Sequence, residues 1–67
     1  MNLKFATILY ECRKEAGFTQ RDLQDKSGIH RNSIVRYENG SAPPVDVFEL
    51  LLDICGYELK VVKKGRR

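Results

Sequence analysis

The sequence predicts an all-α domain of four short helices, followed by a single β-strand. Apolar residues recur at helical spacing in four segments. Glycine, alone or in an Asn-Gly pair, closes each segment, as is usual where a helix ends. Apolar and polar residues alternate only after Gly56. A chain of 67 residues is long enough for one domain with a small core.

The first two helices are expected before Gly28. The first begins after Asn2, a residue that can cap it, and ends at Gly17. The second begins after Thr19, with Asp22 at the capping-box position, and is too short to be stable alone. The core face of the first helix is expected to consist of Phe5, Ile8, Leu9, Cys12 and Ala16.

The third and fourth helices follow an apolar connector at Ile29. The third is expected to begin near His30 or Arg31, to present Ile34 and Tyr37 as an apolar edge, and to end at the Asn39-Gly40 turn. The fourth is expected over residues 45–55, after a proline-containing loop. Its core positions are Val47, Phe48, Leu51 and Ile54.

The alternating segment 57–62 predicts a strand with Tyr57, Leu59 and Val61 on one face. A lone strand leaves its backbone N–H and C=O groups unpaired. Pairing with the same strand of a second copy across a two-fold axis would satisfy them, so these three residues are the expected dimer interface. The alternative is a disordered extension.

Charge is distributed unevenly along a chain whose formal net charge is +3. Residues 26–37 contain no acid but include Arg31 and Arg36, whereas three acids gather at residues 46–53. This polarity suits a protein with one face toward a polyanion. Further cations without acids lie near the C-terminus: Lys60, Lys63, Lys64, Arg66 and Arg67.

Several function classes are disfavoured by what the sequence contains. Cys12 and Cys55 with the single histidine, His30, are too few for a four-ligand zinc site. We expect reduced thiols in a cytoplasmic protein without a cofactor or metal. The sequence shows no membrane-spanning segment and no secretion signal. Without a catalytic triad or phosphate-binding glycine loop, an enzyme is not expected.

A helix, a glycine turn and a second helix span residues 20–37, the pattern of a helix-turn-helix motif. The ordered segments 17–23, 26–29, 33–34 and 37–40 closely resemble the phage repressor/Cro (XRE-type) family, over roughly residues 5–56. The resemblance implies a lambda-repressor-like DNA-binding domain at 1–56, with a recognition helix at about 30–38. A dimerisation strand at 57–62, similar to that of HipB-type antitoxins, and a basic tail at 63–67 follow. A bacterial or phage origin and association with the nucleoid are further implications of the resemblance.

The resemblance also implies roles for single residues. The family's base-contacting positions fall on Arg31, Asn32 and Arg36, whose side chains suit guanine and adenine edges. For Val35 two interpretations stay open: contact with a thymine methyl group, or exposure to solvent. Positions near the DNA backbone phosphates fall on Thr19, Gln20, His30, Ser33, Asn39 and Ser41.

Two further positions concern structure. In the family, an arginine late in the first helix pairs with a glutamate that ends the third, which predicts a partly buried salt bridge between Arg13 and Glu38. Gln24 departs from the family, where alanine lets the two motif helices cross closely. Its stem would either bend toward solvent or splay the helices.

The function that follows is a sequence-specific regulator, expected to repress its own operon by binding a palindromic operator in the DNA major groove as a homodimer. One alternative is an antitoxin that also autoregulates and binds a toxin protein, which the strand-ended architecture suggests. Another is a protein-interaction module that has lost DNA binding. The polar chemistry of the third helix argues against that alternative.

Overall fold

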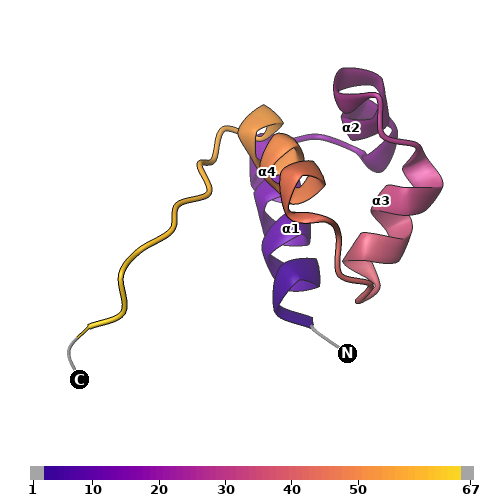
Figure 1. Ribbon diagram of the computed structural model, residues 1–67. Helices are drawn as coiled ribbons and strands as arrows, with labels where there is room; N and C mark the ends of the chain where they lie inside the picture. The colour runs from indigo at the N-terminus through magenta and orange to yellow at the C-terminus, as the bar shows by residue number, and fades with distance from the viewer. Residues whose placement is uncertain (1–2, 66–67) are drawn as a thin grey trace.

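The computed structural model describes residues 3–65 and contains four α-helices in that range (Figure 1). The all-α fold is the one predicted. Asn2, the expected cap of the first helix, and the tail residues Arg66 and Arg67 lie outside the described residues. The helices are α1 (Leu3–Ala16), α2 (Gln20–Ser27), α3 (Arg31–Glu38) and α4 (Val45–Ile54).

The ends of α2 follow from its sequence. Thr19 Oγ1 accepts a hydrogen bond from the Asp22 N–H at 3.0 Å, and Asp22 Oδ2 accepts one from the Thr19 N–H at 2.9 Å. Hydrogen bonding from Thr19, first from its backbone N–H and then from its side chain, holds the pKa of the Asp22 carboxyl below its ordinary value. Gly28 ends the helix with φ of 80°, in the left-handed region that favours glycine.

The core lies where the four helices meet. Leu9, Leu23, Ile34 and Leu51, one from each helix, are fully buried in a single cluster. Phe5 and Phe48 add an edge-to-face ring contact at 5.0 Å between centroids. Truncating any one of the four central side chains to alanine should cost about 2–5 kcal/mol of stability. Because each helix supplies one of these side chains, the unfolding of any helix would expose the core to water.

The helices form two sides of the molecule. Figure 1 shows α2 and α3 together on one side, with α1 and α4 beside them. Helix α3 packs against α1 and α2, and α4 packs against the same two helices. Helix α3 thus has one face against α1 and α2 and another toward solvent.

Residues 57–65, here called the arm, are extended but form no strand. The strand predicted over 57–62 is therefore absent from the described chain. The physical reason is that a ladder needs a second edge, and residues 3–65 of one chain offer none. The strand was the observation that suggested the antitoxin alternative, so that alternative loses its support.

The start of the arm is fixed to the helical body. The Tyr57 N–H donates to the Leu52 carbonyl at 2.8 Å, and the Tyr57 hydroxyl donates to Glu15 Oε1. Leu59 packs against the core, whereas Val61 is 103% exposed. In the single chain, the three residues expected at the dimer interface are thus exposed to different degrees, and their role there stays a prediction. Beyond Leu59 the arm runs away from the body, on the side opposite α2 and α3 (Figure 1).

Candidate nucleic-acid interface

The outer face of α3 gathers the side chains expected to contact bases. Arg31, Asn32 and Arg36 are exposed and Val35 is half-buried, while Ile34 between them is fully buried. Residues three and four apart lie side by side on a helix, so Asn32, Val35 and Arg36 are neighbours. The buried Ile34 fixes which way this face points, and it points to solvent.

The side chains expected near phosphates flank this face. Thr19 and His30 cap the starts of α2 and α3, and Asn39 caps the end of α3. These three are exposed, as is Ser41 in the loop after α3, while Gln20 and Ser33 are half-buried. Helix starts and loops around one exposed helix are an arrangement that can follow a curved phosphate backbone.

A buried ion pair joins the end of α3 to α1. Arg13 Nε donates to Glu38 Oε2 at 2.7 Å and Arg13 Nη2 donates to Glu38 Oε1 at 3.0 Å, so the pair is bidentate. The two side chains are only 9% and 6% exposed. Hydrogen bonding to Glu38 is the main cause that raises the pKa of Arg13.

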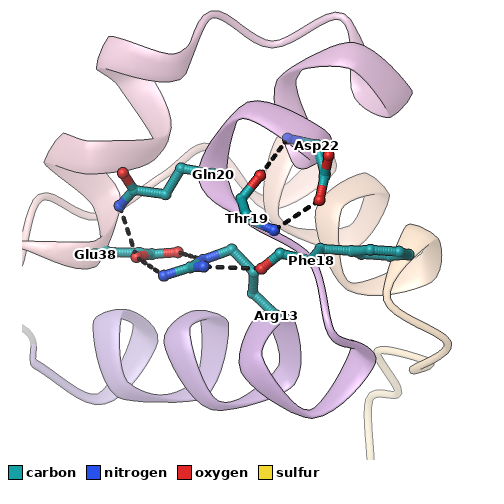
Figure 2. Close-up of polar contacts among 6 residues, drawn as sticks. All are labelled: Arg13, Phe18, Thr19, Gln20, Asp22 and Glu38. Atoms are coloured by element: carbon teal, nitrogen blue, oxygen red, sulfur yellow. Dashed lines mark hydrogen bonds and ion pairs between the residues drawn. The ribbon is translucent and has the colours of Figure 1, made fainter.

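The same ion pair also holds the start of α2. Arg13 Nη1 donates to the Phe18 carbonyl at 2.9 Å, and Gln20 Nε2 donates to Glu38 Oε1 at 3.0 Å. Figure 2 shows Arg13 between the Phe18 carbonyl and Glu38, with Gln20 reaching the same carboxylate. Glu38 thus ties the end of α3 to the start of α2. One amide hydrogen of Gln20 is left for an outside acceptor.

The start of α3 is closed by its own chain. Gln24 Oε1 accepts from the Arg31 N–H at 2.7 Å, and His30 Nδ1 accepts from the Asn32 N–H at 3.0 Å. The His30 carbonyl accepts from the next two N–H groups, at 2.9 and 3.2 Å. Among them, the N–H groups of Arg31, Asn32 and Ser33 are ones that a helix start ordinarily leaves unpaired. Side chains, rather than these backbone groups, must therefore supply the contacts of α3 with an anion.

Gln24 is the functional residue whose role the sequence did not reveal. Its side chain is half-buried, and its amide oxygen caps the start of α3. The only signal was a long polar side chain where the family has alanine. Its acceptor oxygen could be matched to Arg31 only once the positions of α2 and α3 were known.

The start of α2 differs from that of α3. The N–H groups of Gln20 and Arg21 find no hydrogen-bond acceptor among residues 3–65. Unpaired N–H groups and the positive end of the helix dipole both favour an anion. Of the two motif helices, α2 is therefore the one whose backbone can bind a phosphate.

Other kinds of site are not found in the described part of the chain. Between residues 3 and 65 no three metal-ligating side chains gather, and no helix is long and apolar enough to cross a membrane. Cys12 and Cys55 are free and buried, and burial raises the pKa of both thiols.

Comparison with known families agrees with this geometry. The helix-turn-helix family model HTH_3 matches residues 9–62, which is more than half of the chain. No curated protein and no solved structure matches the chain. The matched range contains α2, α3 and the ion pair that joins them to α1. The chain therefore belongs to the XRE-type (Cro/C1-type) helix-turn-helix family of DNA-binding transcriptional regulators, which are not enzymes.

Proposed function

We propose that the protein represses transcription of its own operon by binding a palindromic operator as a homodimer. The observation that supports this most directly is the seating of α3. Its inner face is fixed by Ile34 and its end by Glu38, while Arg31, Asn32 and Arg36 stay exposed. A helix held this firmly positions its outer side chains against base edges at little entropic cost.

In the proposed complex, α3 lies in the major groove. Arg31 and Arg36 donate to guanine O6 and N7, Asn32 pairs with adenine, and Val35 contacts a thymine methyl group. The unpaired N–H groups at the start of α2, with Thr19 and the remaining amide hydrogen of Gln20, bind one phosphate. The other phosphate contacts come from His30, Ser33, Asn39 and Ser41.

The homodimer follows from the size of the reading surface and from the arm. One helix contacts only a few base pairs, so two copies about 34 Å apart are needed to specify an operator. We place the contact between copies in the arm, where the backbone of 58–62 makes no hydrogen bond with residues 3–65 and Val61 is fully exposed. The dimer would block the promoter sterically. Such a role places the protein with the chromosome, in the cytoplasm.

Selection of genomic fragments by the purified protein tests the proposal. We expect enrichment of a two-fold symmetric site, including one upstream of the protein's own gene, and binding that weakens steeply with salt. Absence of any enriched sequence would reject sequence-specific regulation. Enrichment of an asymmetric site would reject the palindromic homodimer but leave DNA binding in place.

Replacing Arg36 tests its contact with a base. Arg36→Ala should reduce discrimination at one operator position by about 1–3 kcal/mol, measured by titrating variants of the selected site. Arg36→Lys is the matched variant, since it keeps the charge but not the planar pair of donors. A base contact requires that both changes relax the preference at the same position. If Arg36→Ala weakens binding to all site variants equally and leaves the base preference unchanged, Arg36 contacts phosphate only.

A further inference from the structure

The outer side of α4 carries an acidic groove that DNA binding does not use. It is an open hollow of about 340 Å³ between α4 and the start of the arm. Its lining contains four carboxylates and no cation. We call it the α4 groove; the residues that matter are Asp46, Glu49, Asp53, Glu58, Leu50 and Tyr57.

The groove combines charge with apolar surface. Leu50 and Tyr57 are each 40% exposed, and the four acids are exposed around them. None of these acids takes part in the single ion pair found among residues 3–65. The groove is thus shaped for a partner that brings both cations and apolar side chains.

The arm has the complementary composition. Lys60, Lys63 and Lys64 are exposed and make no ion pair with residues 3–65, and the intervening Val61 and Val62 are 103% and 79% exposed. Burying two adjacent, solvent-exposed β-branched side chains against a partner lowers the free energy. The arm therefore offers what the groove lacks.

The arm of one chain cannot readily reach its own groove. Tyr57 and Glu58 form part of the groove wall, and the Tyr57 hydroxyl bond to Glu15 fixes that wall in place. To return Lys63 to the groove, the chain would have to reverse within residues 60–62. That Lys-Val-Val segment contains none of the residues that favour a turn.

We propose that the α4 groove binds the basic arm of a second copy of this chain, and that each copy receives the arm of the other. This inference rests on the proposed homodimer and names the surface that holds it together. Two arms that pass each other antiparallel over 57–62 bring Lys63 and Lys64 close to the C-terminal end of the partner's α4. A two-fold axis then satisfies both grooves at once.

The arrangement leaves DNA binding unobstructed. The arm departs on the side of the molecule away from α2 and α3 (Figure 1). The groove residues also lie on α4 and the arm, not on the exposed face of α3. Opposite charges therefore serve two separate surfaces, one for DNA and one for the partner chain.

Charge reversal on the two sides tests the proposal. In the full-length chain, the arm variant K63E/K64E and the groove variant E49K/D53K should each weaken the dimer about tenfold or more. An equimolar mixture of the two should dimerise again, because reversed arms meet reversed grooves and native arms meet native grooves. Sedimentation equilibrium at moderate salt gives the dissociation constants.

A matched control separates the site of the charges from their number. The variant E11K/D25K makes the same change in net charge at two exposed acids outside the groove, and it should dimerise as the native chain does. Thermal unfolding followed by circular dichroism verifies that each variant is folded. All substituted side chains are exposed, so their folding should be unaffected.

The possible failures are distinguishable. A native dimer that survives both reversals, or a mixture that does not recover, overturns arm docking while the homodimer stands. A monomeric native chain overturns both. Binding to a single operator half-site, measured on the same samples, reports DNA recognition separately from either result.

Discussion

Arg13 and Glu38 form a polar junction inside a core that has little room for charge. Both side chains are almost completely buried, so each has lost most of its hydration. Their bidentate contact, with the Phe18 carbonyl and Gln20 as further partners, offsets that cost. Because Glu38 ends α3 and Gln20 begins α2, the junction orients the two helices that face DNA.

Removing one member of the pair should be worse than removing both. Arg13→Met leaves the buried Glu38 carboxylate with Gln20 as its remaining partner, and should lower the free energy of unfolding by about 3 kcal/mol. Urea denaturation of the purified variant measures this loss.

The double variant R13M/E38L provides the comparison. It removes both charges and should be closer to the native chain in stability than R13M alone, because no unpaired charge stays buried. A double variant that loses as much as the sum of the two single changes would show that the two side chains stabilise the domain independently, with no coupling across the ion pair. DNA affinity should fall in both cases, because α3 loses its link to α1 through Arg13, and in the double variant it also loses its link to Gln20.

At the level of elements, α3 is a short helix whose start depends on a neighbour. Gln24 on α2 binds the first N–H of α3, so the two motif helices are joined at this end as Glu38 joins them at the other. A helix of eight residues is marginal alone and depends on such contacts.

Gln24→Ala should loosen the start of α3 without unfolding the domain. The loss of one cap costs about 1 kcal/mol, and the Arg31 N–H is left without its acceptor. Amide exchange measured by NMR should therefore accelerate at Arg31 more than in the rest of α3. Asp25→Ala, at the exposed neighbouring position, should leave that rate unchanged. Equal rates at Arg31 in the native chain and Gln24→Ala would show that the cap has no effect in solution.

The contacts that the sequence could predict are those between residues close together in the chain. The start of α2 could be predicted because Thr19 and Asp22 are three residues apart and bond each other locally. The Gln24 cap depends on how two helices cross, and the Tyr57 contact with Glu15 joins residues 42 apart. Neither has a local signal. The predicted strand is absent for a further reason: the sequence does alternate, but the described residues 3–65 offer no edge with which the segment could pair.

The whole molecule is held by one core that includes both cysteines. Cys12 and Cys55 are 8% and 7% exposed, and desolvation raises their thiol pKa above the ordinary value of 9.0. The neutral thiols are favoured by folding. This contribution to stability is present below pH 9.0 and is lost as the pH rises through the raised values.

Thiol labelling should therefore report unfolding of the whole domain. At neutral pH, a disulfide reagent should modify both cysteines slowly, because the reactive thiolate is scarce and covered. The rate should rise along the same urea curve that circular dichroism gives for global unfolding. Rapid labelling of the native chain at either cysteine would show a local opening at the junction of α1 and α4.

The cap at the start of α3 has a consequence for the chemistry of its surface. His30 Nδ1 accepts the Asn32 N–H, so that nitrogen holds no hydrogen, and the ring hydrogen must reside on Nε2. The tautomer is thereby chosen by the protein's own backbone. The outward edge of the imidazole can only give a hydrogen bond, never take one. In a DNA complex it can meet a phosphate oxygen or the N7 of a purine, but the exocyclic amine of cytosine offers it nothing.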